Sequence, residues 1–186
     1  MEQAALKQVQ YGGITTQAPE IWDVETEEHQ EFDGQISYSI AITAPGNDVR
    51  SIDLSFGPLP VGSDAYSEAC GTYEEVIGEE GLQASSADQH TGGMEQETGE
   101  SPILCFEFKG MKAYGFSLIT EDGQPCFFFC LDIPQPGQTD QTQADQAQAG
   151  QPLADQSKLL TVLLRAAGNE ELQSLLDFVE EHLSCR

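Results

Sequence analysis

Three apolar runs follow one another between residues 102 and 133: Ile103-Leu-Cys-Phe-Glu-Phe108, Met111-Lys-Ala-Tyr-Gly-Phe-Ser-Leu-Ile119 and Cys126-Phe-Phe-Phe-Cys-Leu131. Lys109-Gly110 joins the first two runs and Glu121-Asp122-Gly123 joins the last two, and a glycine after a polar residue suits the positive φ of a tight antiparallel turn. The stretch therefore predicts a three-stranded meander in the middle of an antiparallel sheet. The third run is apolar at both sets of alternating positions, which is typical of a strand covered on both faces.

Two strands with strict alternation precede this stretch. The first runs from Gln35 to Thr43 and the second from Arg50 to Phe56, with Pro45-Gly-Asn-Asp48 as the turn between them. Apolar side chains occupy every second position in both strands, and small or polar side chains occupy the other positions. This alternation predicts an antiparallel pair with one face packed on a core and one face in water.

Helical periodicity and a hairpin signal occur outside these strands. Ser63 or Asp64 can cap a helix that continues to about Glu80, because apolar residues recur there at three- and four-residue steps. Asn169 can cap a C-terminal helix whose apolar face is expected to dock on the core. Near the N-terminus, Gly12-Gly13 between two short runs predicts a hairpin.

The segment Lys158-Leu-Leu-Thr-Val-Leu-Leu-Arg165 has two interpretations. With Leu160, Val162 and Leu164 on one side it fits a strand, and with its leucines at three- and four-residue steps it fits a helix. Periodicity alone leaves both interpretations open.

Length and composition indicate one domain, residues 1–186, with two polar interruptions. A chain of 186 residues with 39% hydrophobic residues and nine Phe can bury a sizeable core. Residues 82–101 are small, polar and acidic, and predict a flexible acidic loop. Residues 134–157 are of low complexity, rich in Gln, Ala, Asp and Thr, and predict a disordered insertion.

The formal net charge is −25, from seven basic and 32 acidic residues. Direct binding of nucleic acid phosphates or of an anionic membrane surface is therefore not expected. Four explanations of the charge stay open: solubility, a basic protein partner, mimicry of nucleic acid, and a salty cytoplasm. The candidate partner surface is the densest acidic patch, part of which, from Glu25 to Glu31, is expected to be a surface loop. Its members are Glu20, Asp23, Glu25, Glu27, Glu28 and Glu31.

The cysteines and the N-terminus favour a cytoplasmic protein. Five cysteines are an odd number without the spacing of a disulfide framework. Cys126 and Cys130 cannot pair within one strand, because four residues span roughly 13 Å and a disulfide tolerates about 7 Å between Cα atoms. Residues 1–7 lack the basic and apolar regions of a signal peptide, and no run reaches the length of a membrane span.

No catalytic, cofactor-binding or metal-binding motif emerges from the sequence. It lacks His-Glu-x-x-His, paired Cys-x-x-Cys, a phosphate-binding loop and Gly-x-Ser-x-Gly. His29, His90 and His182 are far apart and in acidic surroundings, where exposed positions are expected. Glu107 lies in an apolar strand, where an outward position on the sheet is favoured over a pocket carboxylate of raised pKa. A Cys–His pair built from Cys70 or Cys105 has no local support.

The order of the expected elements, together with two phrases, resembles the PsbP/DcrB-like superfamily. The phrases are Tyr11-x-Gly13-Ile14-x-Thr16-x-x-Pro19-x-x-Trp22 and Phe108-Lys-Gly-Met-Lys-Ala-Tyr114. The resemblance implies an α+β fold in which an antiparallel sheet is flanked by helices as an α/β/α sandwich, and it implies that Leu159 to Arg165 is a strand. Known roles in that superfamily are non-catalytic: photosystem-associated binding, Ran binding in nuclear import, and envelope lipoproteins.

These observations predict a non-enzymatic, cytoplasmic binding module for a protein partner, and a basic partner is one of the open alternatives. Two other functions stay open: an enzyme with an unrecognised site, and an acidic inhibitor that mimics nucleic acid. Mimicry requires carboxylates in two rows spaced like phosphates.

Overall fold

The structure is a computed structural model, and it describes residues 5–30, 34–46, 48–80, 83–84, 102–134 and 157–185. The described elements are, in order, β1 (Leu6–Tyr11), β2 (Ile14–Pro19), β3 (Asp23–Gln30), β4 (Ile36–Thr43), β5 (Ser51–Pro58), α1 (Ala65–Glu80), β6 (Gln83–Ala84), β7 (Leu104–Phe108), β8 (Met111–Ile119), β9 (Pro125–Ile133), β10 (Lys158–Arg165), α2 (Asn169–His182) and β11 (Ser184–Cys185). The polar stretches predicted at 82–101 and 134–157 lie outside the described residues except at 83–84, 134 and 157, and so do Glu31 and His90.

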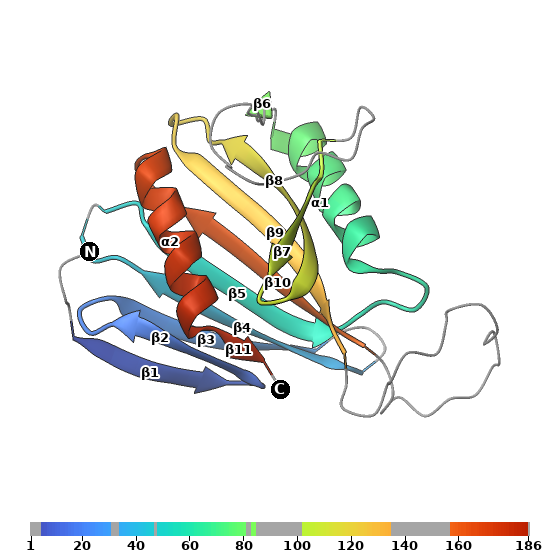
Figure 1. Ribbon diagram of the computed structural model, residues 1–186, viewed down its shortest axis with the longest axis horizontal. Helices are drawn as coiled ribbons and strands as arrows, with labels where there is room; N and C mark the ends of the chain where they lie inside the picture. Colours follow the sequence, from blue (N-terminus) through green and yellow to red (C-terminus); the bar gives the residue numbers. More distant parts are fainter. Residues whose placement is uncertain are drawn as a thin grey trace.

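The described strands form two antiparallel sheets (Figure 1). The large sheet has eight strands in the order β3–β4–β5–β10–β9–β8–β6, with β7 also paired to β8. The small sheet has the order β1–β2–β11. The expected α+β class with a predominantly antiparallel sheet is confirmed, and so are the N-terminal hairpin and the C-terminal helix.

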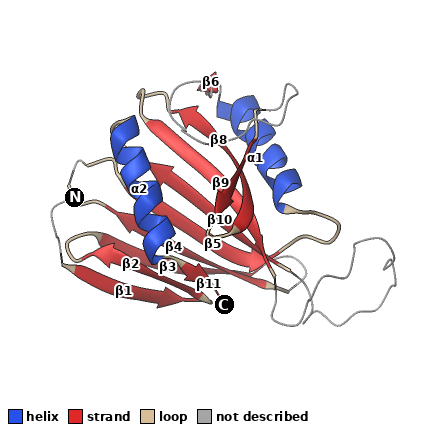
Figure 2. Ribbon diagram, in the orientation of Figure 1, coloured by secondary structure: helices blue, strands red, loops and turns tan. Residues whose placement is uncertain are grey.

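The large sheet has a hydrophobic core on each face. On one face it packs against α2 and the small sheet, and this core includes Leu54, Phe129 and Val162 of the sheet and Phe178 of α2. Figure 2 shows α2 lying across this face, which we call the covered face. On the other face α1 packs against β8 and β9 around a smaller core that includes Phe116.

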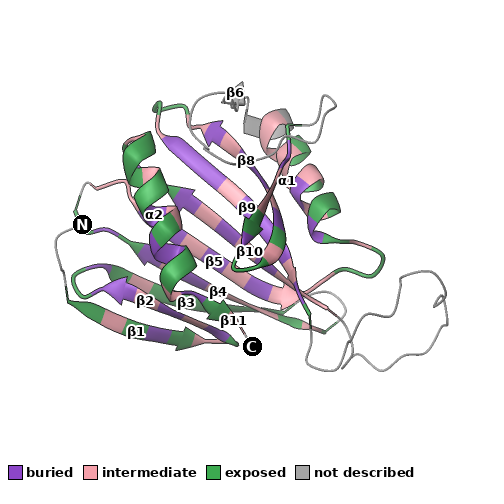
Figure 3. Ribbon diagram, in the orientation of Figure 1, coloured by how far each residue is buried: buried purple, intermediate pink, exposed green. Residues whose placement is uncertain are grey.

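β9 belongs to both cores, as its sequence predicts. Phe127 and Phe129 lie in the core of the covered face, whereas Cys126 and Cys130 lie in the core beneath α1. Figure 3 shows β9 buried along most of its length. The strand is apolar at consecutive positions because a hydrophobic core lies on each of its faces, although Phe128 is only half-buried.

The position of the meander corrects the prediction. β7, β8 and β9 pair in succession as expected, but they lie at one side of the sheet rather than in its middle. β10 pairs with both β9 and β5, so it separates the meander from the β4–β5 pair. β10 is a strand, as the resemblance implied, and it buries Leu160, Val162 and Leu164 in the covered face.

The segment from Glu25 to Glu31 was expected to be a loop, and that prediction is wrong for its described part. Residues 23–30 form β3, an edge strand paired with β4 over its whole length, from Asp23 opposite Thr43 to Gln30 opposite Ile36. An edge strand has a neighbour on one side only and tolerates charged side chains, so its sequence need not be apolar.

The N-cap predicted for α1 is confirmed, whereas the N-cap predicted for α2 is wrong. The Asp64 carboxylate accepts a hydrogen bond from the Ser67 N–H at 2.8 Å, so Asp64 caps α1 as expected. The Ala65 N–H also donates to the Asp132 carboxylate of β9 at 3.1 Å, which ties the start of α1 to the sheet. The N-cap of α2 is Gly168 rather than Asn169: the backbone of Gly168 is extended, and Asn169 is the first residue of the helix.

Tight turns occur where glycines predict them. Lys109 and Gly110 have φ values of 53° and 79°, as the turn between β7 and β8 requires. Gly12, at φ 55°, begins the turn between β1 and β2, and a Cβ atom there would lie 1.9 Å from Cγ of Tyr38 on β4. The N-terminal hairpin therefore packs directly on the large sheet through a position where only glycine fits.

Candidate functional site

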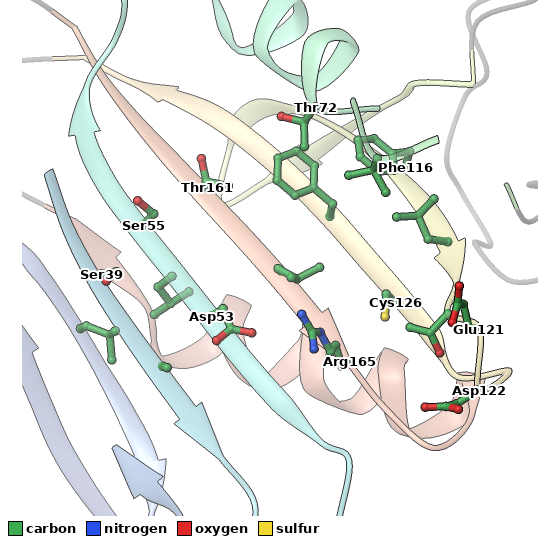
Figure 4. Close-up of a pocket in the computed structure, with 18 residues that line it drawn as sticks. Ser39, Asp53, Ser55, Thr72, Phe116, Glu121, Asp122, Cys126, Thr161 and Arg165 are labelled. Carbon is green, nitrogen blue, oxygen red and sulfur yellow. The ribbon is translucent and has the colours of Figure 1, made fainter. Parts of the chain in front are cut away.

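Part of the large sheet is left uncovered on the side where α1 lies. α1 packs on β8 and β9, and its core extends to Leu159 and Leu163 of β10, but among the described residues no helix or strand packs extensively on this side of β4 and β5. We call this uncovered part of the sheet the open face. A groove of about 940 Å³ runs over it, and Figure 4 shows its lining. The strand residues that line the groove include Ser39, Ala41, Asp53, Ser55, Thr161 and Leu163.

The open face follows directly from the alternation of β4 and β5. Ile40 and Ile42 of β4 and Ile52, Leu54 and Phe56 of β5 lie in the core of the covered face, and each is at most 1% exposed. Their intervening residues, such as Ser39 and Ser55, are half-buried on the opposite side. The predicted division into a packed and a wet face is thus confirmed, and the wet face forms the floor of the groove.

Side chains on the open face form rows that change character across the strands. One row runs through Glu25, Ala41, Asp53, Leu163 and Phe128. The next row runs through Glu27, Ser39, Ser55, Thr161 and Cys130. Each row begins with a carboxylate on the edge strand, continues through small or polar residues, and ends with residues of the core beneath α1.

The wall of the groove nearest α1 is apolar. Phe116 and Phe128 stack with ring centroids 5.0 Å apart, and Tyr73 of α1 meets Phe116 edge to face at 5.2 Å. Phe128 and Leu163 are only half-buried, although both contribute to this core. Apolar side chains left partly in water beside a groove are a common feature of binding surfaces.

One end of the groove carries charges of both signs. Burial raises the pKa of the Asp53 carboxyl, and a hydrogen bond from Ser51 Oγ at 3.2 Å and the positive charge of Arg165 partly oppose this rise. Arg165 is exposed, and among the described residues it has no carboxylate within ion-pairing distance. Glu121 and Asp122, at the turn between β8 and β9, add two exposed carboxylates to the same groove (Figure 4).

Two buried thiols of the core beneath α1, those of Cys126 and Cys130, are disfavoured in their thiolate form. Burial raises the pKa of the Cys126 thiol, with Asp53 adding to the effect and Arg165 opposing it. Burial raises the pKa of Cys130 to about 12, and its Sγ lies 3.0 Å from the Ala65 carbonyl oxygen. A thiol with a raised pKa stays protonated near neutral pH and is a poor nucleophile. All five cysteines are described, and none forms a disulfide.

The structure divides the predicted acidic patch. Glu25 and Glu27 line a hollow of about 480 Å³ together with Ser39 and Ala41, so they border the open face. Glu28 pairs with Tyr38, whose ring contacts Tyr11 of the small sheet, which places Glu28 on the other side of β3.

The other members of the patch have different settings. Asp23 is exposed at the start of β3, opposite Thr43. Glu20 lies in the turn after β2, where its backbone carbonyl accepts a hydrogen bond from Lys7 Nζ at 3.2 Å. Glu31 is not described. The patch is therefore not one surface, and the part that borders the groove is Glu25 and Glu27.

The remaining candidates from the sequence are Glu107 and the two described histidines, whose exposure the structure gives. Glu107 is exposed, which confirms its outward position on the sheet. His29 is exposed on β3, with Nε2 3.3 Å from Ser39 Oγ. His182 is half-buried against the ring of Phe178, not exposed as its acidic surroundings suggested. The described residues contain no group of three or more His, Cys, Asp or Glu placed to hold a metal ion.

Sequence reasoning missed Asp53, Arg165 and Thr161 as groove residues. Asp53 and Thr161 occupy the non-apolar positions of alternating strands, and that is the only signal the sequence carries for them. Their proximity depends on the pairing of β5 with β10, whose residues are far apart in the chain.

Fold and groove together define a class: an acidic α+β protein whose antiparallel sheet is half uncovered on one face. Comparison with models of protein families, with curated proteins and with solved structures finds no match to this chain. In the described part of the chain, neither helix has the length and apolar character needed to cross a membrane.

Proposed function

We propose that this protein is a binding module without catalytic activity, which holds a basic, partly apolar segment of a partner protein on the open face. The observation that carries this proposal is the groove itself. It combines an acidic border, a floor of small side chains and an apolar wall, and among the described residues no element fills it.

The charges around the groove favour a basic partner. Glu25, Glu27, Asp53, Glu121 and Asp122 line the groove and the hollow that adjoins it through Ser39 and Ala41. Against these five carboxylates, the groove's described lining offers one cation, Arg165. A border of one sign attracts an oppositely charged partner and accelerates its association.

The floor and wall suit a polypeptide segment. Ser39, Ala41, Ser55 and Thr161 are small, so a backbone or a long side chain can approach the sheet closely. The half-buried Phe128 and Leu163 give apolar side chains of the segment a surface to cover. A helix or strand with basic and apolar residues would therefore match the groove.

The two other functions have weaker support. For an enzyme, the groove's lining supplies one half-buried carboxylate, Asp53, and one buried thiol, Cys126, without a base placed to activate them. For nucleic acid mimicry, the carboxylates of β3 lie on both sides of the strand rather than in two parallel rows on one surface. The five free thiols support the proposal of a reducing, cytoplasmic location.

We also propose that the fold belongs with the PsbP/DcrB-like arrangement. Its support is a central antiparallel sheet with a helix on each face, an N-terminal hairpin, and a strand directly before the last helix. A superposition of an experimental structure on members of that superfamily would test it, and a different strand order would overturn it.

The binding proposal is tested with a capped amphipathic peptide of Lys and Leu and its counterpart with Glu in place of Lys. The basic peptide is expected to bind, with an association rate that falls steeply as salt rises, because exposed charges are screened beyond roughly 8 Å at physiological ionic strength. The double variant Glu25→Gln, Glu27→Gln should associate several-fold more slowly, whereas the control Glu180→Gln, at an exposed position of α2, should change the rate less. Equal binding of both peptides, or of neither, would overturn the proposal.

A further inference from the structure

The edge strand β3 presents an open backbone beside the groove. Its eight residues pair with β4 in an unbroken register, and within the described part of the chain β3 has no other strand neighbour. In an antiparallel strand, alternate residues direct their N–H and C=O groups away from the neighbour that they have. Such an edge is a template on which another extended chain can pair.

The acidic side chains of β3 disfavour pairing with another acidic strand. Four of its eight residues are acidic, none is Lys or Arg, and none is Pro. A second copy of this protein pairing edge to edge would bring Asp and Glu side chains opposite one another, which is destabilising. An acidic chain is excluded for the same reason, but a basic chain is not.

We infer that β3 accepts an extended basic segment of the partner as an additional antiparallel or parallel strand, which extends the large sheet. This inference rests on the proposed function and specifies how the partner is held. The occupant is a strand with Lys or Arg at alternate positions. Side chains of that strand on the groove side would lie beside Glu25 and Glu27, and those on the other side would lie beside Thr26 and Glu28.

Two features of the structure support strand addition over docking on the groove floor alone. Carboxylates flank the β3 backbone on both sides, Glu25 and Glu27 on one and Glu28 on the other, so both faces of an added strand would meet opposite charge. The added strand would also continue the rows of the open face outward, because Glu25 and Glu27 face Ala41 and Ser39 at the groove.

The test uses the full chain and a capped peptide of about ten residues that alternates Lys and Val. A second peptide has the same sequence with alternate backbone amides N-methylated, so that it keeps its charge but cannot pair along one edge. Binding is measured by fluorescence anisotropy at low salt, and backbone amide exchange is measured residue by residue. The unmethylated peptide is expected to bind at least about tenfold more tightly and to slow exchange in β3 but not in β5, because strand addition depends on main-chain hydrogen bonds.

The possible outcomes separate this inference from the proposed function. If both peptides bind equally and exchange in β3 is unchanged, the strand-addition inference fails, while binding of a basic segment on the open face stands. If neither peptide binds, both fail. If a Glu–Val peptide protects β3 as well as the Lys–Val peptide does, the charge selection is wrong. A several-fold loss of affinity in the variant Glu25→Gln, Glu27→Gln, with β3 still protected at saturation, would support the inference.

Discussion

The two faces of the large sheet are built by the same strands but differ in how far they are buried. On the covered face, Ile40, Leu54, Phe129 and Val162 are each at most 1% exposed beneath α2 and the small sheet. On the other face, the residues next to them in sequence are half-buried small or polar side chains wherever α1 does not reach. Burial of apolar surface is the main stabilising contribution to a fold, so the covered face is expected to contribute more to stability than the open face.

The apolar pattern of each strand shows how far α1 covers the large sheet. β9 is apolar on both faces because α1 covers it, and β5 is apolar on one face because α1 does not reach it. β10 lies between them and is intermediate, with Leu163 and Thr161 on the partly covered side. The number of apolar faces on each strand thus follows the layer that lies over it.

The largest effect on stability is expected when two neighbouring residues of β5, one on each face of the sheet, are compared. Leu54→Ala removes a side chain that is 1% exposed in the core of the covered face and should lower the free energy of unfolding by about 2–5 kcal/mol. Ser55→Ala, on the open face, should change it by less than about 0.5 kcal/mol. Urea unfolding measures both, and similar losses would show that the two faces contribute equally.

The next effect concerns how the small sheet covers the large one. Gly12→Ala introduces a Cβ atom 1.9 Å from Tyr38 Cγ at a residue with φ 55°, and should destabilise the protein by about 1–3 kcal/mol. The control Gly62→Ala has a similarly unfavourable φ of 83° but no atom within 4 Å, so only the backbone strain of about 1 kcal/mol is expected. Thermal unfolding of both variants separates contact from strain, and equal shifts would argue against the hairpin contact.

A smaller effect tests the partial cover that α1 provides. Asp132→Ala removes the carboxylate that accepts the Ala65 N–H at 3.1 Å and should cost about 1 kcal/mol, as the loss of a helix cap does. Exchange of the first amides of α1 should rise, while exchange in α2 stays unchanged. Faster exchange in both helices would mean that the two layers are not independent.

The smallest effect is a pH dependence at the open face. Burial raises the pKa of Asp53 in the folded state above its ordinary value of 3.8, so the folded protein binds more protons than the unfolded chain between these two values. Its contribution to stability therefore falls as pH rises through this window. Asp53→Asn should be slightly more stable than the wild type at pH 7, and the gap should close as pH falls toward 3.8. The exposed Glu121→Gln is the control, and a gap that widens on acidification would contradict the burial of Asp53.

The faces of β4 and β5 could be predicted from sequence, because a period of two assigns each residue to one side. The covered state of β9 and the existence of both helices follow from similar local patterns. β3 could not be predicted in this way. Glu and Asp have low strand propensity, and an edge strand with one neighbour needs little apolar surface to stay in place.

The groove could not be predicted because it depends on strand order. Local pattern leaves Lys158–Arg165 undecided between strand and helix, and nothing in it indicates insertion between β5 and β9. That insertion brings Arg165 into the same groove as Asp53 and places Thr161 beside Ser55. The acidic patch is divided because successive side chains of β3 point to opposite faces of the sheet. The loop that the sequence predicted for these residues would not have this alternation.

Blocking the groove tests most directly whether the open face binds a basic segment. Ser55→Trp places a bulky side chain on the groove floor, whereas Ser174→Trp places the same side chain on the exposed surface of α2. Both variants should keep the melting temperature within a few degrees, and Thr161→Trp repeats the test at a second floor position. The dissociation constant of the Lys/Leu peptide should rise about tenfold or more for Ser55→Trp and stay unchanged for Ser174→Trp. Unchanged affinity in a folded Ser55→Trp variant would contradict binding at the open face.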